Sequence, residues 1–506
     1  MIGSLLTVLM VPLQQIPALL PIVFIVAALA IVAVGLRSDS MAQPIATLGA
    51  ALAAILCLNG LIGTGAAGPV NYFFGGWTPP VGIEFVLDGL SAFMGLVVNG
   101  VAALVLWHSG GMRRGQLAEK QTAFYALTML LLLGLNGMLL TGDLFNLYVF
   151  LEISSLASYA LISIGDRRAP YAAFRYLIIG TVGGTFYLLG VGFLYTMTGT
   201  LNMADMASLL PDVAGTAPVV TALILMVTGI GIKAALFPMY GWLPEAYTHA
   251  SAVSSALIAP IGTKVAAYVT IRVLLFVFGV DLIDLVVPVS GALGVLAGVG
   301  ILFGSLMAIS QTNLKRMLAF SSVSQIGYIL MGISLMNPLG FAGAVFHVLT
   351  HAVMKACLFL VSANIELREG HTDLSRFDDS YRRKYPMTMA LFTIAAISMI
   401  GLPPMAGFFS KWVLALGTIQ AGNWFLLAVI LASSLLNAVY FFKILERVYL
   451  KRPGSEAKAA GDDAAQPTVH EAPWTMRLPA LVLALALIGF GLANAPVVTL
   501  IQGWFP

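Results

Sequence analysis

Four lysines stand inside hydrophobic stretches long enough to cross a lipid bilayer, in a chain of 506 residues of which only 9% are charged. These are Lys233, Lys264, Lys355 and Lys411. Because a lysine near the centre of a bilayer costs about 2.5–3.5 kcal/mol, four of them indicate a function that needs buried charge. Glu152 is the carboxylate at comparable depth, and lysine and glutamate can both exchange protons when burial and neighbouring charges tune them. The set predicts a proton path across a membrane protein.

Glu152 and Lys233 are predicted to form an ion pair. Glu152 falls about half-way along the apolar stretch 143–163, and Lys233 directly precedes an interruption rich in proline and glycine at 237–244. A lysine at that depth needs a counter-charge, and a pair that separates would act as a switch for proton release. The alternative for Glu152 is a protonated carboxyl group that is hydrogen-bonded to a backbone carbonyl.

Two further cations lie in the apolar stretch 251–278. Lys264 is mid-span, where neighbouring glycine and threonine leave room for water, and it is predicted to carry protons. Snorkelling of the side chain to the membrane surface is the alternative. Arg272 lies nearer the end of the stretch, so it is expected to snorkel, and no role is assigned to it.

His347, His351 and Lys355 follow one another at intervals of four residues and therefore share one face of a helix. Two histidines with this spacing could bind a metal ion. However, the glutamate of a zinc-binding HExxH motif is absent, since Val348 and Leu349 follow His347, and no carboxylate or cysteine nearby completes a site. Histidine exchanges protons near neutral pH. A proton relay is predicted, with polar packing between helices as the alternative.

Three more residues flank the interruptions in the apolar pattern. Lys411 follows the second interruption at 401–407 and is predicted to be the counterpart of Lys233. Glu245 and His249, four residues apart, could form a cytoplasmic entry point for protons or a solvated pair. The remaining carboxylates near the membrane surface are expected to be solvated loop charges, namely Asp143, Asp166 and those of residues 366–379.

The composition sets the protein class. Hydrophobic residues make up 59% of the chain, which is typical of an all-α polytopic membrane protein. The net charge of +3 reflects basic loops that flank the membrane, and it does not imply a nucleic-acid partner. Cys57 and Cys357 lie in apolar runs far apart, so they form no disulfide framework and no iron–sulfur or zinc pattern. No cofactor and no metal are predicted.

At about 20 apolar residues per crossing, the sequence predicts fourteen transmembrane helices. They begin near residues 12, 44, 83, 121, 143, 171, 217, 251, 283, 319, 341, 387, 424 and 477. The seventh and the twelfth are broken, at 237–244 and 401–407, because proline removes a backbone donor and kinks a helix. Irregular backbone at membrane depth survives only where protein or a watery cavity surrounds it.

The distribution of cations predicts the orientation. Of 25 Lys and Arg residues, 20 fall in alternate loops or at the adjoining helix ends, whereas the opposite loops carry aspartate. By the positive-inside rule the cationic loops are cytoplasmic, and both termini lie outside. The apolar run near 16–35 has no convincing cleavage site after it, so we expect an uncleaved first helix. The protein is placed in the cell inner (plasma) membrane as a multi-pass protein.

The two broken helices are five crossings apart, so equivalent segments run in opposite directions through the membrane. We predict two inverted five-helix repeats, the fourth to eighth helices (121–278) and the ninth to thirteenth helices (281–452). Three helices (1–110) precede them. A polar cytoplasmic loop (453–475) and a fourteenth, C-terminal helix (476–506) follow.

Several of these segments together resemble the proton-pumping antiporter-like subunits. The resemblance is carried by residues 142–152, 233–244, 313–325, 347–359 and 401–408. This family includes the D-type subunits of Mrp-type multisubunit monovalent cation/proton antiporters, related subunits of respiratory complex I, and subunits of membrane-bound hydrogenases. The likeness covers roughly residues 83–450.

The resemblance implies fourteen helices, two inverted repeats and a central hydrophilic axis along which Glu152, Lys233, Lys264, His347 or His351, and Lys411 carry protons. It implies as partners the other subunits of a membrane assembly, protons, Na⁺ or K⁺, and the lipid bilayer. We expect a subunit of a cation/proton antiporter. A proton-pumping subunit of complex I or of a membrane-bound hydrogenase is the alternative, and a single-chain symporter for an organic solute is a more distant one.

Overall fold

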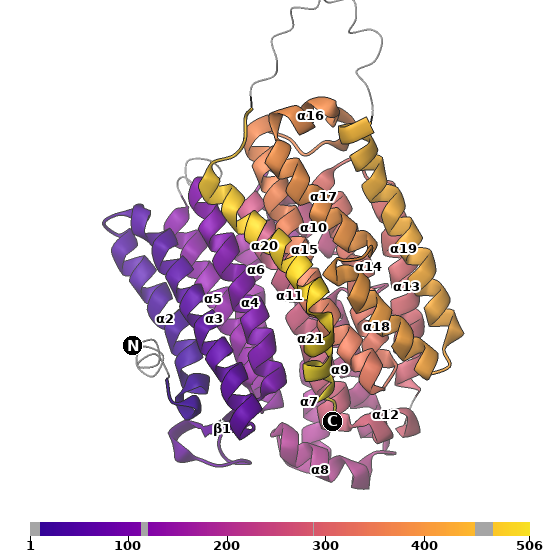
Figure 1. Ribbon diagram of the computed structural model, residues 1–506. Helices are drawn as coiled ribbons and strands as arrows, with labels where there is room; N and C mark the ends of the chain where they lie inside the picture. The colour runs from indigo at the N-terminus through magenta and orange to yellow at the C-terminus, as the bar shows by residue number, and fades with distance from the viewer. Residues whose placement is uncertain (1–10, 113–119, 287, 451–468) are drawn as a thin grey trace, which may run out of the picture.

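The computed structural model describes residues 11–112, 120–286, 288–450 and 469–506, which form an almost entirely helical bundle (Figure 1). Within these ranges, thirteen helices are long and apolar enough to cross a membrane. The predicted twelfth crossing is divided between two shorter helices, α17 (Pro386–Ile400) and α18 (Ala406–Gln420). Together they make the fourteen crossings predicted from the sequence, so that prediction is confirmed.

The first three crossings are α2 (Ile16–Gly35), α3 (Ala42–Ala67) and α4 (Gly89–Ser109). Two short antiparallel strands, β1 (Val70–Phe73) and β2 (Glu84–Leu87), join α3 to α4. This pair is an addition to the predicted all-helical fold.

The remaining crossings follow in two series. The first consists of α5 (Gln121–Leu140), α6 (Leu144–Ser163), α7 (Ala169–Thr198), α9 (Ala217–Ala234) with α10 (Leu243–His249), and α11 (Ala252–Ile271) with a π-helical extension (Arg272–Phe278). The second consists of α13 (Val289–Ile309), α14 (Leu314–Ser334), α15 (Pro338–Glu369), α17 with α18, and α19 (Trp424–Leu445) with its π-helical extension (Glu446–Leu450). The chain ends with α20 (Trp474–Leu492) and α21 (Asn494–Gln502), so the predicted C-terminal helix is two helices.

The two ends of the bundle differ in charge. The upper end in Figure 1 carries loops rich in lysine and arginine and the short helix α16 (Asp379–Lys384), and we call it the cationic end. The opposite end carries β1, the short helices α8 (Met203–Val213) and α12 (Val280–Val286), and several aspartates, and we call it the acidic end. Arg113, Arg114, the side chain of Asp284 and residues 453–468 of the predicted polar loop lie outside the described part of the chain.

A matching backbone clasp relates the two series. At the acidic end Asp143 pairs with Asn202 in an isolated β-bridge, and at the cationic end Asn313 pairs with Asp373 in the same way. In the first clasp, the Leu144 N–H donates to the Leu201 carbonyl and the Met203 N–H donates to the Gly142 carbonyl. In the second, the Leu314 N–H donates to the Thr372 carbonyl and the Leu374 N–H donates to the Thr312 carbonyl. Because the same clasp occurs at opposite ends, α6–α7 and α14–α15 are inverted equivalents.

Both predicted helix breaks are present at the predicted places. The first half-helix α9 ends at Ala234, and the next residue, Ala235, has a φ of 61°. In the second broken helix, the half-helix α17 ends at Ile400, and Gly401 follows with a φ of 91°. A left-handed residue ends a helix and leaves its last carbonyls without intrahelical partners. The first break lies beside α14, where the ring of Tyr240 is near that of Phe320, and both half-helices of the second break pack on α15. The apolar stretches of α14 and α15 are completely buried in the bundle.

Candidate functional site

Glu152 and Lys233 lie together in the first series. Lys233 Nζ is 3.6 Å from Glu152 Oε1 and donates hydrogen bonds to Ser155 Oγ at 2.7 Å and to the Tyr159 hydroxyl at 3.3 Å. The three partners share one face of α6 because they are spaced by three and four residues. The Lys233 side chain is only 7% exposed and that of Glu152 24%. The ammonium group is therefore held by one carboxylate and two hydroxyls inside the bundle.

Two glycines of α7 leave the space that this pair occupies. A Cβ atom on Gly184 would lie 2.4 Å from Glu152 Oε1, and one on Gly180 would lie 2.2 Å from the Tyr159 hydroxyl. Contacts this short do not occur between non-bonded atoms, so a larger residue at either position would push the polar side chain away.

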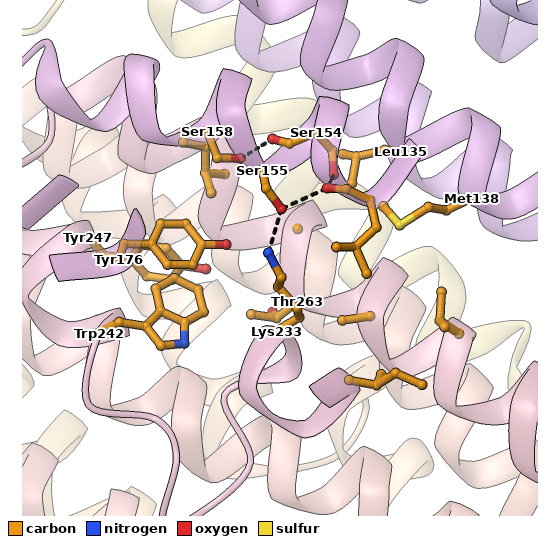
Figure 2. A pocket seen from close by; sticks show the side chains of 16 residues that line it. Leu135, Met138, Ser154, Ser155, Ser158, Tyr176, Lys233, Trp242, Tyr247 and Thr263 are labelled. Atoms are coloured by element: carbon orange, nitrogen blue, oxygen red, sulfur yellow. Dashed lines mark hydrogen bonds between the residues drawn. The ribbon is translucent and has the colours of Figure 1, made fainter. Parts of the chain in front are cut away.

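A cavity of about 40 Å³ opens beside Lys233. Hydroxyls from α6 and Thr263 of α11 line it together with a group of aromatic rings. Figure 2 shows the Lys233 amine pointing toward Ser155, with Tyr176, Trp242 and Tyr247 gathered on one side. The rings of Tyr176 and Trp242 stack with centroids 3.7 Å apart. A polar cavity of this size has room for water, which could carry protons between these groups.

Lys264 is fully buried in α11. Its ammonium group donates to the Ala259 carbonyl oxygen at 2.6 Å and to Thr263 Oγ1 at 3.3 Å, and both acceptors are neutral. The side chain does not reach the membrane surface, which argues against the snorkelling alternative. Gly262 and Thr263, the neighbours predicted to leave room for water, line the cavity beside Lys233. The residues directly before Lys264 therefore reach the cavity that Lys233 lines.

His347, His351 and Lys355 form a buried polar face on α15. His347 Nδ1 lies 2.9 Å from Ser410 Oγ and its Nε2 lies 2.9 Å from Gln325 Oε1. The His351 ring is 6.0 Å from that of His347, and neither of its nitrogens has a hydrogen-bond partner among the described residues. A buried imidazole without partners has both nitrogens available for water. Among the described residues, no three or more His, Cys, Asp or Glu side chains are placed so that they could hold a metal ion together.

Lys355 and Lys411 are both held by backbone oxygens. Lys355 Nζ donates to the Leu318 carbonyl at 2.6 Å. Lys411, on α18, reaches back across the helix break and donates to the carbonyls of Met399 and Ile400 at 2.9 and 3.0 Å. Its ammonium group thus occupies the negative end of α17, where unpaired carbonyls favour a cation.

The expected equivalence of Lys411 and Lys233 is only approximate. Lys233 lies on the half-helix that precedes its break, whereas Lys411 lies on the half-helix that follows the other break. At the first break the corresponding role belongs to Trp242, whose indole N–H donates to the Ile232 carbonyl at 2.9 Å. Spacing from a proline could not distinguish the two sides of a break.

Glu245 and His249 belong to a cluster at the cationic end. His249 Nδ1 lies 2.8 Å from Asp166 Oδ2, and its Nε2 lies 3.2 Å from Glu245 Oε2. Glu245 also pairs with Arg316 at 3.1 Å, which joins the two series. Burial alone would raise the pKa of Asp166, but hydrogen bonds from His249 and from the Arg168 backbone amide outweigh it and hold that pKa below its usual value.

Three expectations about charged residues are wrong. Arg272 does not snorkel, because its guanidinium donates to both carboxylate oxygens of Asp88 at 2.6 Å. Glu366, expected in a solvated loop, lies 3.6 Å from Lys315, which is itself buried. Asp143, also expected to be solvated, is only 9% exposed because its side chain caps the start of α6. The pairings of Arg272 with Asp88 and of Lys315 with Glu366 join segments far apart in sequence, and hydropathy carries no signal for them.

Comparisons with known proteins identify the family of the chain. The family described as "NADH:quinone oxidoreductase/Mrp antiporter, TM" matches residues 141–437. The N subunit of the NADH-quinone oxidoreductase of Desulforudis audaxviator is 49% identical over 436 residues, which cover 85% of this chain and 86% of the relative. The D-type subunit of the Na(+)/H(+) antiporter of Alkalihalophilus pseudofirmus is 34% identical over 373 residues, which cover 73% and 74%.

A solved structure of an Mrp complex from Dietzia sp. DQ12-45-1b contains a chain that superimposes with a TM-score of 0.86 at 27% identity, with 97% of this chain and 96% of that chain covered. The family match spans more than half of the sequence and includes α6, both half-helices of each break, α11, α14 and α15. The chain therefore belongs to the NADH:quinone oxidoreductase/Mrp antiporter membrane family.

Proposed function

We propose that this chain is the proton-translocating membrane subunit of a multisubunit monovalent cation/proton antiporter. Protons pass along Glu152, Lys233, Lys264, the histidines of α15 and Lys411, and Na⁺ or K⁺ moves in exchange. The observation that supports this most directly is the 3.6 Å approach of Glu152 and Lys233 beside a polar cavity. A buried pair of opposite charges that can open and close is a natural switch for a mobile proton.

The proposed transfer is electrostatic. While Lys233 holds a proton, its charge disfavours a second proton on Lys264, and the low-dielectric interior strengthens that repulsion. When Lys233 gives up its proton, this repulsion disappears, so Lys264 takes up a proton more readily. We place His351 between Lys264 and Lys355 in the sequence of transfers, because both lysines are charged neighbours of this imidazole.

The remaining steps lead to the second helix break. His347 shares a hydrogen bond with Ser410, the residue next to Lys411. A proton on Lys411 is stabilised by the carbonyls at the end of α17, and its loss would release these carbonyls to water. The two series, at 121–278 and 281–452, would then act as two halves of the path that alternate in charge.

The proposed orientation follows the charge distribution. The cationic end faces the cytoplasm and both termini face outward, in the cell inner membrane. Protons would enter at Glu245 and His249, because this cluster lies at the cationic end and on the half-helix that follows Lys233. The partners would be the other subunits of the antiporter, in keeping with the names of the antiporter relatives.

A second candidate function is favoured by one comparison. The relative with 49% identity is named as a subunit of NADH-quinone oxidoreductase, so the same proton path could serve a pump driven by redox chemistry in another subunit. The proposed transfers through Glu152, Lys233 and Lys411 are the same in both candidates. They differ in what drives them.

Proton movement in inverted membrane vesicles tests the two candidates. The intact gene cluster is expressed in a host that lacks its own antiporters, and it is compared with Glu152→Ala, Lys233→Ala and Lys411→Ala. An antiporter dissipates a preformed proton gradient when Na⁺ or K⁺ is added, and each variant abolishes this. If the cations have no effect and NADH-driven or hydrogen-driven pumping fails in the variants, the redox pump is correct. Variants that transport normally in both assays would refute the path itself.

A further inference from the structure

We propose that protons have a second inlet from the cationic end, which lies in the second series and runs through Tyr440 and Ser321 to Lys355. This inference rests on the proposed function, because it supplies a water-accessible route to a lysine of the proton path. It is separate from the cluster of Glu245 and His249, which belongs to the first series.

The inner end of the inlet is the contact between Lys355 and Ser321. Lys355 Nζ lies 2.5 Å from Ser321 Oγ, and both side chains are fully buried between α15 and α14. The Ser321 hydroxyl donates to the Leu318 carbonyl at 2.9 Å, which is the same carbonyl that accepts from Lys355. A hydroxyl that accepts from one group and donates to another can pass a proton by rotating.

Tyr440 of α19 forms the middle of the inlet. Its hydroxyl donates to Asn437 Oδ1 at 3.0 Å and lies on the side of α19 that faces Ser321. The Tyr440 side chain is only 1% exposed, and its phenol ring separates Ser321 from the cavity on the other side. The amide nitrogen of Asn437 has no hydrogen-bond partner among the described residues. A buried amide donor beside a phenol marks a position where water would bind.

The outer end is a cavity of about 50 Å³ that Tyr440 lines from within. Its polar lining comes from Gln311, Ser375, Lys443 and Arg447. These groups offer hydrogen bonds, and the volume exceeds the roughly 10–15 Å³ that one water needs by the same measure.

The cavity lies under a short turn at the cationic end. Arg447 Nη1 donates to the Leu374 carbonyl at 2.5 Å and so ties the turn Leu374–Arg376 to α19. The clasp between Asn313 and Asp373 holds the same turn against the start of α14. The turn therefore bounds the cavity on one side and Tyr440 bounds it on the other, while the exposed residues Ser375 and Lys443 in its lining connect it to the surface of the cationic end.

The arrangement differs from ordinary polar packing in one respect. Ser305, Ser324, Ser433 and Asn437 form a hydrogen-bonded group between α13, α14 and α19, and that group alone would hold the helices together. The hydrogen bond of Tyr440 to Asn437 extends this group toward the cavity, and the hydrogen bond between Lys355 and Ser321 lies on the side of the proton path. Packing alone needs neither extension.

The test compares Tyr440→Phe with Tyr449→Phe in the intact complex. Tyr449 lies on the same helical run, but its hydroxyl contacts Thr393 of α17 and lines neither the cavity nor the path. Proton uptake at the cationic end is followed after a pH jump, with a dye enclosed in vesicles, together with the amount of assembled complex. Tyr440→Phe and Ser321→Ala are expected to slow uptake severalfold with normal assembly, whereas Tyr449→Phe behaves as the parent protein.

Three outcomes are informative. Uptake at the parental rate in Tyr440→Phe, while Lys355→Ala remains inactive, would refute the inlet and leave the proposed function standing. If Lys355→Ala and Glu152→Ala both transport normally, the proposed function itself fails. If Ser433→Ala, which changes only the packing group, slows uptake as much as Tyr440→Phe and lowers the melting temperature equally, Tyr440 acts only by packing and the inlet is refuted.

Discussion

Lys233 Nζ lies within 3.6 Å of Glu152 Oε1, yet its shorter contacts are to Ser155 and Tyr159. The hydroxyls can hold the ammonium group when the carboxylate withdraws, so the pair can open without exposing a bare charge. Removing one partner of a buried pair typically costs about 3–5 kcal/mol, and less where, as for Glu152, a quarter of the side chain is exposed.

We therefore predict that Glu152→Gln abolishes cation-driven proton movement while the protein still assembles. Proton transfer by a positioned side chain typically contributes about 10²–10⁴-fold to a rate, and a loss of that order is expected. Vesicle fluorescence measures the rate, and purification of the complex measures assembly. Ser163→Ala is a suitable control, because this hydroxyl contacts only its own helix at the exposed end of α6. Normal transport in Glu152→Gln would exclude the pair as a switch.

A second prediction concerns the space beside the pair. In Gly184→Ala the new methyl group would meet Glu152 Oε1 at 2.4 Å and force the carboxylate away from Lys233. Transport should fall as far as in Glu152→Gln. Gly192→Ala is a matched control on the same helix, because a Cβ there meets no atom within 4 Å. Equal transport in the two alanine variants would show that the approach of α7 does not position the pair.

Much of the fold could be predicted because membrane depth is encoded in local composition. Runs of apolar residues located the fourteen crossings, and proline clusters located both breaks. The spacing of four residues between His347, His351 and Lys355 predicted their shared face, since a helix repeats every 3.6 residues. The broken helices five crossings apart predicted the inversion that the clasps of Asp143 and Asn313 display.

The rest depended on contacts between distant segments. Hydropathy gives the depth of a residue but not the direction in which its helix turns it, so the pairing of Arg272 with Asp88, 184 residues away, was not predictable. The acceptors of Lys411 are backbone carbonyls, which every residue has, and only the end of α17 makes them available. The cavity beside Tyr440 is formed where four segments meet: the end of α13, α14, the turn at 374–376, and α19. No sequence motif in these segments indicates that they form a cavity.

The capping contact of Lys411 leads to a third prediction. Lys411→Met leaves the carbonyls of Met399 and Ile400 without their side-chain donor, which costs about 1–3 kcal/mol per unsatisfied group, and it removes the proton-carrying amine. Both stability and transport should fall. Lys411→Arg keeps a donor but holds its proton permanently, so it should retain stability and lose transport. Thermal unfolding in detergent, alongside vesicle transport, separates the two effects, and an active Lys411→Arg would contradict a proton-carrying role.

A fourth prediction concerns pH at the cationic end. Because the pKa of Asp166 is held below its usual value, its contribution to stability is present above the pKa of an unfolded aspartate, about 3.9, and is lost as pH falls through the lower folded value. The melting temperature of Asp166→Asn should therefore lie below that of the parent protein near pH 5, and the difference should shrink toward pH 3. Since Asp166 is 55% exposed, the difference will be small. A difference that grows on acidification would contradict this sign.

The last prediction separates two roles of Asp88. Its side chain caps the start of α4 by accepting from the Ser91 amide at 2.8 Å, and it also pairs with Arg272. Asparagine is an equally good N-cap residue but lacks the negative charge, so Asp88→Asn keeps the cap and weakens only the pair. Hydrogen bonds to charged groups contribute about 1.5–3 kcal/mol, so a clear drop in melting temperature is expected.

Asp281→Asn, an exposed carboxylate at the same end, is the control and should leave the melting temperature unchanged. Asp88→Ala removes both the cap and the pair, and the missing cap should lower stability further by about 1 kcal/mol. If Asp88→Asn melts like the parent protein while Asp88→Ala does not, the cap alone stabilises this end. In that case Arg272 is held by Tyr268, whose hydroxyl accepts from its Nε at 2.7 Å.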